Sequence, residues 1–254
     1  MLQITPAENS MLYSGPTNII NQINNEHHIP DEDLTTNEID GYVVFLDVLG
    51  VKNKIKDGGI NIILGQLLDL SKSVEEYISD SQQGDCFKFL SVSDCIILIC
   101  ERESGLNSFL KIISKIVWKA LNSYELLLRG AITKGKLYVI SKSDSAGYVQ
   151  ILGRAYMDAY ELQENNAVYP RIIFSDGIKL NKDDKRCILD KDGMRFLNYI
   201  FCIANLDEIQ INNVIEKLKV QYKKFQPGRS EKKIDLHIEE RKKIAWAINY
   251  LKER

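Results

Sequence analysis

The hydrophobic pattern of the chain switches between short apolar runs of strand length and longer segments with helical spacing. Tyr42–Leu46 is continuously apolar and rich in β-branched and aromatic residues, which is typical of a central strand buried on both faces. Segments 60–79 and 105–123 instead place their apolar residues three and four positions apart. Each of these two segments therefore predicts an amphipathic helix.

A tight hairpin is predicted between these two helices. Phe87–Val92 and Cys95–Cys100 have the composition of strands, and only Ser93-Asp94 separates them. Other elements expected from the pattern are strands over 126–140, 171–174 and 199–204, and helices over 153–163, 207–226 and 231–253. The order of these elements predicts an α+β sandwich, with a mostly antiparallel sheet, flanking helices and a C-terminal helical tail.

We expect three parts along the chain: an N-terminal extension over 1–38, a central domain over 39–205 and a helical extension over 206–254. The first part is rich in Asn, Thr and Glu without periodicity, so ordered structure is expected to begin at Gly41. It contains the adjacent pair His27-His28, which we interpret as solvated because no nearby set of ligands completes a metal site.

Composition and charge exclude several classes of protein. The 254 residues are 44% hydrophobic and carry a formal net charge of -2, so a sizeable core is expected without the basic excess of a nucleic-acid-binding protein. No apolar run approaches the ~18 residues of a membrane span. The N-terminus lacks the basic and apolar regions of a signal peptide. Five cysteines without a CxxC pair predict reduced thiols, and we expect a cytoplasmic protein with no nucleic-acid or membrane partner.

Two aspartates stand where strands end. Asp47 terminates the buried run, and Asp94 lies in the hairpin. An ionised carboxylate beside so much apolar surface is costly unless it is paired or bound to a metal. If the strands are neighbours, the two carboxylates meet at one end of the sheet, where they suit Mg²⁺ or Mn²⁺. Two such ions ~3.5–4 Å apart can clamp the attacking and leaving oxygens of a phosphoryl displacement. The alternative is that each aspartate is only a turn or cap residue.

The segment after Asp47 fits the same chemistry. Val48, Leu49 and Gly50 link the strand to a helix, and their backbone N–H groups are expected to bind a triphosphate at the helix N-terminus. The pattern of strand, aspartate, turn, glycine and helix also occurs in flavodoxin-like and hydrolase folds.

Five segments resemble, in order and spacing, the motifs of class III adenylate/guanylate cyclases. They are Phe45-Leu46-Asp47-Val48-Leu49-Gly50, Ser91-Val92-Ser93-Asp94, Leu128 through Gly135, Gly153 through Ala159, and Arg171 through Ser175. Together they cover roughly residues 41–204. The resemblance implies a class III cyclase-like fold over a catalytic domain, in which Asp47 and Asp94 hold two divalent metal ions, Mn²⁺ or Mg²⁺.

The departures from the family pattern concern the base and the transition state. Leu90 stands where adenylate cyclases carry an adenine-reading lysine, and Gln150 replaces the partner acid of that lysine. Met157 and Glu161 replace the usual asparagine and arginine of the transition state. The altered pattern resembles the pyrimidine cyclases of bacterial anti-phage (Pycsar) systems. That resemblance implies cyclic UMP or cyclic CMP as product, a separate effector, and a homodimer whose composite sites combine residues of both subunits.

Four basic residues near the motifs are candidates to contact the substrate. Arg154 is the first candidate for the missing transition-state arginine, because its forked guanidinium suits phosphate oxygens. Alternatively, Arg129 and Arg171 form structural ion pairs with acidic residues. For Lys134, the alternative is an exposed lysine at the end of a strand.

The base-reading residues are expected among three others. Gln150 is suited to a pyrimidine edge because its amide both donates and accepts hydrogen bonds. Leu90 and Tyr156 would shrink the pocket against a purine, and their alternative is a place in the core. UTP is favoured slightly over CTP. Two other functions stay open: an adenylate cyclase with atypical base contacts, and a catalytically inactive cyclase fold that senses nucleotides.

Overall fold

The computed structural model describes residues 34–56, 58–142, 149–181, 183–225 and 231–254. These described residues form one eight-stranded sheet in the order β2-β3-β1-β4-β6-β8-β7, with β5 paired to β4 off this path. The strands are β1 (Leu34–Val48), β2 (Phe87–Val92), β3 (Cys95–Cys100), β4 (Leu128–Lys142), β5 (Val149–Leu152), β6 (Ile172–Phe174), β7 (Cys187–Leu189) and β8 (Arg195–Leu197). All pairings are antiparallel except that of β4 with β6.

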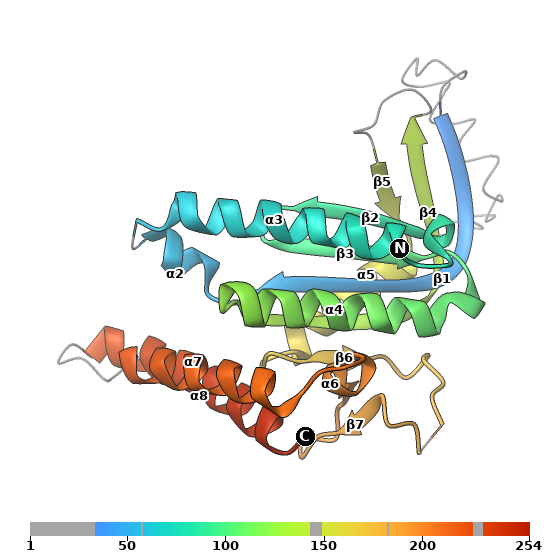
Figure 1. Cartoon of the computed structure of the whole chain (residues 1–254). Coiled ribbons are helices and arrows are strands. Elements are labelled where there is room, and N and C mark those ends of the chain that lie inside the picture. The colour runs from blue at the N-terminus through green and yellow to red at the C-terminus, as the bar shows by residue number, and fades with distance from the viewer. Residues whose placement is uncertain (1–33, 57, 143–148, 182, 226–230) are drawn as a thin grey trace, which may run out of the picture.

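Strand β1 lies at the centre of the sheet, between β3 and β4. Phe45 is opposite Ile97 on β3 and Ala131 on β4. The strand begins at Leu34, before the expected start of order at Gly41, because β4 pairs with it along its whole length. The two strands continue beyond the body of the sheet as a long ladder that β5 joins (Figure 1). The pair His27-His28 lies outside the described residues.

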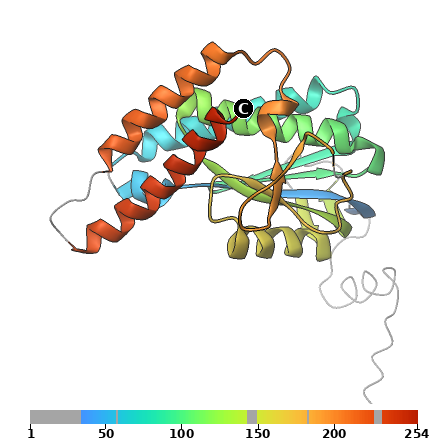
Figure 2. The ribbon, with the colours of Figure 1, turned by 90° about the horizontal axis from the view of Figure 1, so that it is seen from below.

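Helices cover both faces of the sheet. The helices are α2 (Val51–Lys56), α3 (Ile60–Ser79), α4 (Leu106–Tyr124), α5 (Arg154–Asn166), α6 (Tyr199–Cys202), α7 (Glu208–Lys224) and α8 (Glu231–Lys252), with 3-10 turns over Gly84–Cys86 and Glu103–Gly105. Helices α3 and α4 lie on one face and α5 on the other, as Figure 2 shows. Side chains of β1 alternate accordingly: Val44 packs in the larger core, and Val43 in the smaller core beneath α5.

The C-terminal helices α7 and α8 pack on the larger core. Val214 of α7 and Ile244 of α8 are almost fully buried in the same apolar cluster as α4. The predicted fold class, an α+β sandwich with a mostly antiparallel sheet and a helical tail, is confirmed. The boundaries between 1–38, 39–205 and 206–254 stay a prediction.

One predicted element is wrong. The segment 199–204 was expected as a strand, but residues Tyr199–Cys202 form the short helix α6. The Asn198 side chain caps this helix by accepting a hydrogen bond from the Phe201 N–H. Tyr250 of α8 in turn donates its hydroxyl hydrogen to Asn198, so a distant contact fixes the turn.

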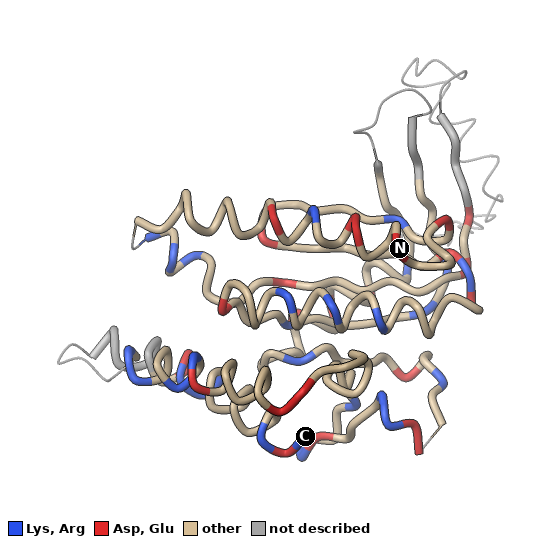
Figure 3. The backbone as a smooth tube through the Cα atoms, in the orientation of Figure 1, with Lys and Arg blue, Asp and Glu red and all other residues tan. Residues whose placement is uncertain are grey.

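Charged residues of both signs are interspersed along the described backbone (Figure 3), as the small net charge suggests. In the part of the chain that the structure describes, no helix combines the length and the apolar character needed to cross a membrane.

A buried ion pair fixes the far side of the sheet. The side chain of Arg171 is 1% exposed, and its guanidinium donates to the carboxylates of Asp190 and Asp192. Trp246 of α8 donates its indole N–H to the same oxygen of Asp190, 3.2 Å away. The pair therefore joins the start of β6, the β7–β8 turn and the last helix.

Replacing Arg171 by methionine should destabilise the fold. The variant keeps the volume of the side chain but leaves Asp190 and Asp192 without their cation. Breaking a buried pair costs ~3–5 kcal/mol, and we expect about 2–3 kcal/mol here because Asp192 is half-exposed. Urea unfolding monitored by circular dichroism measures the loss, and Arg195→Met, which removes a part-exposed arginine of the same region, is the control.

In Arg171→Met, the free energy of unfolding should fall less steeply as pH is lowered than it does in the wild type. The hydrogen bond from Arg171 lowers the pKa of Asp192. A carboxyl with a lowered folded pKa contributes stability above its unfolded pKa of ~3.9 and loses it as pH falls through the folded value. An equal acid dependence in the wild type and Arg171→Met would show that this pair contributes nothing.

Candidate active site

The two sequence-predicted metal aspartates meet at one end of the sheet. The β1–β3 register places Asp47 opposite Cys95, and Asp94 precedes Cys95 in the hairpin turn. A carboxylate oxygen of each aspartate and the Cys95 Sγ atom all lie within 4.8 Å of one another. Two carboxylates and a thiol at this separation fit the donor set of a divalent cation.

The hairpin turn is tied to the end of β1. Ser93 adopts the left-handed conformation (φ 57°), and its hydroxyl donates to Asp94 Oδ1 at 3.0 Å. The Val48 N–H donates to the Asp94 carbonyl oxygen at 3.1 Å. These bonds hold the backbone of Asp94 beside that of Asp47, so the proximity of the two carboxylates is built into the fold.

Arg129 contacts Asp47 from strand β4, on the side opposite Cys95. It stands opposite Asp47 on β4, and its Nε donates to Asp47 Oδ2 at 2.8 Å. A terminal nitrogen of the same guanidinium donates to Glu164 of α5 at 3.2 Å. Asp47 is thus left with Oδ1 toward Cys95, whose thiol lies 3.9 Å away.

The electrostatics of Asp47 show a cost of burial. Its side chain is only 18% exposed, and burial raises the pKa of the carboxyl even though the hydrogen bond from Arg129 opposes the shift. Burial also raises the pKa of the Cys95 thiol to about 12, with Asp47 and Asp94 adding to the effect. Without a metal ion, the negative charge of Asp47 beside Asp94 and Cys95 therefore lowers the free energy of unfolding.

The loop after Asp47 is anchored on both sides. The Leu49 N–H donates to the Leu127 carbonyl oxygen at 2.8 Å, and the Val48 N–H donates to the Asp94 carbonyl oxygen. The side chains of Val48 and Leu49 are buried, and Gly50 turns the chain with φ +81°. Two of the N–H groups expected to bind a triphosphate are therefore already paired. The role of this loop in substrate binding stays a prediction.

Leu90 and Tyr156 lie on the same face of the sheet as the aspartates. Leu90 is opposite Ile97, which is in turn opposite Phe45, two residues before Asp47. The rings of Phe45 and Tyr156 have centroids 6.2 Å apart. Both Leu90 and Tyr156 are partly exposed and pack against the smaller core.

Lys134 and Gln150 lie away from the aspartates in the protomer. Lys134 follows Arg129 by five residues on β4, which is ~17 Å along a strand, and its amine pairs with Glu103. Gln150 is exposed on β5 and pairs with Ile140, farther along the same strand.

Arg154 is at the far end of α5. Glu164, which contacts Arg129, comes ten residues later, ~15 Å along the helix. The Arg154 side chain is 84% exposed and pairs with Asp158 one turn on. It is free to face a partner molecule, but a single protomer does not bring it to Asp47.

Arg171 requires a correction. It was expected to bind substrate, but its buried guanidinium is committed to Asp190 and Asp192. The structure therefore favours the alternative, a structural ion pair, for this arginine.

Two residues of the site were missed in the sequence. From the sequence, Cys95 is expected only to be a reduced thiol, and no pattern points to Glu164. The signal for Cys95 is its place after Asp94, since a strand that begins there and pairs with the end of β1 must bring it beside Asp47. Glu164 carries no such signal, because only the packing of α5 brings it to Arg129.

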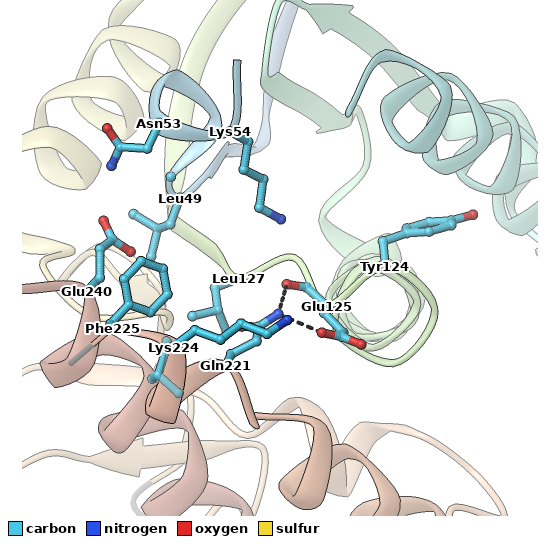
Figure 4. Close-up of a pocket in the computed structure, with 12 residues that line it drawn as sticks. Leu49, Asn53, Lys54, Tyr124, Glu125, Leu127, Gln221, Lys224, Phe225 and Glu240 are labelled. Carbon is cyan, nitrogen blue, oxygen red and sulfur yellow. Dashed lines mark hydrogen bonds between the residues drawn. The ribbon is translucent and has the colours of Figure 1, made fainter. Parts of the chain in front are cut away.

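A separate cavity of about 310 Å³ lies behind the loop, between α4 and the helices α7 and α8 (Figure 4). Leu49 and Gly50 form part of its wall, and the Lys54 side chain points into it. Burial lowers the pKa of Lys54, and the nearby Glu125 and Glu240 oppose the shift. Neither Asp47 nor Asp94 lines this space.

The fold is similar to solved cyclase structures. The adenylyl cyclase CyaB from P. aeruginosa matches with TM-score 0.42 and 17% identity, over 56% of this chain and 79% of that one. A dimeric guanylyl cyclase domain of the RhoGC fusion protein from the aquatic fungus Blastocladiella emersonii matches with TM-score 0.46 and 9% identity, over 63% and 94%. A bacterial light-regulated adenylyl cyclase matches with TM-score 0.46 and 16% identity, over 80% and 63%.

These similarities bear on the fold alone. A scan against protein-family models found no match, and neither did a search of curated proteins.

Asp47→Asn should not destabilise the metal-free protein at neutral pH. A carboxyl whose folded pKa is raised makes the fold less stable as pH rises from its unfolded pKa through the folded one. The neutral amide removes that cost, so we expect an unchanged or higher melting temperature in chelator-treated protein, measured by calorimetry. A marked loss of stability would mean that the ion pair with Arg129 outweighs burial, and Asp158→Asn is the matched exposed control.

Proposed function

We propose that this chain is a pyrimidine nucleotide cyclase, which converts UTP or CTP to the 3′,5′-cyclic nucleotide and pyrophosphate. The observation that carries the proposal is the convergence of Asp47 and Asp94 at one end of the sheet. The product would serve in the cytoplasm as a second messenger of bacterial anti-phage defence and activate a separate effector. This last step rests on the resemblance of the sequence motifs.

The reaction is an in-line attack of the ribose 3′-oxygen on the α-phosphorus, with pyrophosphate leaving. Asp47 through Oδ1 and Asp94 would hold two divalent ions. When bound, such ions lower the pKa of the 3′-hydroxyl and neutralise the triphosphate. Arg129 orients Asp47 by holding its other oxygen, so the free oxygen keeps one direction. Catalysis would be mostly positioning and charge stabilisation.

A pyrimidine is favoured by two residues on the face that carries the aspartates. Leu90 has no group that could hydrogen-bond a purine, and its side chain, like that of Tyr156, packs against the smaller core. In the proposed site, these two side chains would leave less room for a purine ring. Burial raises the pKa of Tyr156 further above the neutral range, so its hydroxyl is an uncharged neighbour for a base.

A homodimer with composite sites is favoured by the distribution of charge. The aspartates lie at one end of the sheet. Lys134 and Gln150 lie farther along the β4–β5 ladder, and Arg154 begins α5, ~15 Å along the helix from Glu164. A two-fold axis that sets the aspartates of one protomer against Lys134, Gln150 and Arg154 of its partner would complete two equal sites. Arg154 would then stabilise charge on the transferred phosphoryl group across the interface.

Incubation with each of the four NTPs and Mn²⁺ should yield a cyclic pyrimidine nucleotide. Pyrophosphate release and chromatography of the product identify the substrate. Asp47→Asn and Asp94→Asn should each lower the rate by ~10³-fold or more, because one metal ligand contributes several kcal/mol to transition-state stabilisation. Asp85→Asn, which changes an exposed aspartate outside the proposed site, is the control.

The assay separates the other functions as well. Turnover of ATP alone would reject the pyrimidine and indicate an adenylate cyclase with atypical base contacts. Nucleotide binding without pyrophosphate release would indicate an inactive sensor.

Mixing two inactive variants should restore activity if the sites are composite. Asp47→Asn lacks a metal ligand, and Arg154→Ala lacks the phosphate-binding residue of the partner. In a mixed dimer one site carries both changes and the other carries neither, so we expect activity to approach half the wild-type rate per mixed dimer. Mixed variants that stay as inactive as each alone would place all catalytic groups within one protomer. Asp47→Asn mixed with Asp94→Asn is the control, because both changes then fall on the same side and neither site is intact.

A further inference from the structure

The centre holds a third donor that is chemically unlike the other two. The Cys95 sulfur lies 3.9 Å from Asp47 Oδ1, which is the oxygen that Arg129 leaves free. Asp94 adds a carboxylate whose Oδ1 accepts from Ser93. The three groups come from the end of β1 and the start of β3, so backbone pairing fixes their positions.

The spacing fits a cation between them. A metal ion that binds sulfur at ~2.3 Å and a carboxylate oxygen at ~2.1 Å with a tetrahedral angle separates these two atoms by ~3.6 Å. The observed 3.9 Å between Cys95 Sγ and Asp47 Oδ1 is close to this value, and an Asp94 oxygen lies within 4.8 Å of the sulfur and of an Asp47 carboxylate oxygen. Only a small movement of side chains is needed to bring all three onto one ion.

Cys95 is also placed to be reached from solvent. Cys86 and Cys100, the two other thiols of this region, are fully buried beneath the opposite face. Cys95 is only partly buried and lies on the face that carries the aspartates. Among these thiols, Cys95 alone combines solvent access with oxygen donors beside it.

We propose that Cys95 is a third protein ligand of the Asp47–Asp94 centre, which makes the centre bind soft divalent cations such as Zn²⁺ and Cd²⁺ through sulfur. This inference rests on the metal centre of the proposed function. Thiolate selects soft ions, whereas Mg²⁺ and Mn²⁺ are satisfied by the carboxylates alone. A soft ion held by three protein groups would occupy the place of the working ions and stop turnover.

Metal binding through sulfur replaces the S–H bond of Cys95 with a sulfur–metal bond. The S–H bond of Cys95 breaks, a bond from sulfur to the metal forms, and the proton passes to the solvent. No electron is transferred, and the ion keeps its charge. One proton is therefore released for each sulfur–metal bond, in addition to any lost by the carboxylates.

The test is a titration of the metal-free protein with Cd²⁺. A cadmium–thiolate bond gives an ultraviolet charge-transfer band, which we expect once per protomer in the wild type. The band should disappear in Cys95→Ser and in Cys95→Ala. It should persist in Cys187→Ser, which removes a partly buried cysteine of β7 far along the sheet order.

Affinities give the second measurement. Calorimetry should show that Cys95→Ser weakens Cd²⁺ binding at least about tenfold, equivalent to 1.4 kcal/mol. Mn²⁺ binding, followed by its electron paramagnetic resonance signal, should change by less than about twofold. A band that survives in both Cys95 variants, or equal Cd²⁺ affinities, would overturn the proposal.

The Mn²⁺ signal keeps this inference apart from the proposed function. If the wild type binds Mn²⁺ and Asp47→Asn does not, the metal site formed by the carboxylates is supported, independently of the result of the Cd²⁺ titration. If the wild type binds neither ion, the metal centre falls, and both proposals fall with it.

Discussion

A carboxylate at the end of the central strand has to be compensated, and the region around Asp47 is arranged by that need. Strand β1 lies between β3 and β4, so the neighbours of Asp47 on its own face are set by register: Cys95 on one side and Arg129 on the other. Arg129 offsets part of the burial cost, yet the pKa of Asp47 is still raised. A fold that tolerates this cost at one point, while the rest of the sheet is conventional, is typical of a functional site.

Elements that depend on the local hydrophobic pattern are predicted from the sequence. Elements that depend on contacts between residues far apart in the chain are missed. The central strand, the hairpin at Ser93-Asp94 and the long helices follow from periodicity, and the convergence of the aspartates follows from their places at strand ends. The helix at Tyr199–Cys202 was missed because its cap depends on Tyr250 of α8. The three-residue strands β7 and β8 are too short to show a period. Arg171 was misplaced because its partners, Asp190 and Asp192, reach it only through the β7–β8 turn.

The separation of charge within the protomer has a physical rationale. A flexible, exposed arginine beside two uncompensated carboxylates would pair with them and quench the site before any substrate arrived. Arg154 instead pairs with Asp158 on its own helix, a weak exposed contact that a phosphate would replace readily. Arg129 is the exception, and it is confined to one oxygen of Asp47 by its second bond to Glu164.

The oxygen of Asp190 that accepts from both Arg171 and Trp246 has a consequence for biosynthesis. Arg171 lies at the start of β6, but the tryptophan that shares its counter-ion follows Asp190 by 56 residues. A nascent chain that has released the sheet but not yet α8 would bury this guanidinium with an incomplete set of partners. The far edge of the sheet is therefore expected to close late on the ribosome, after the last helix has emerged.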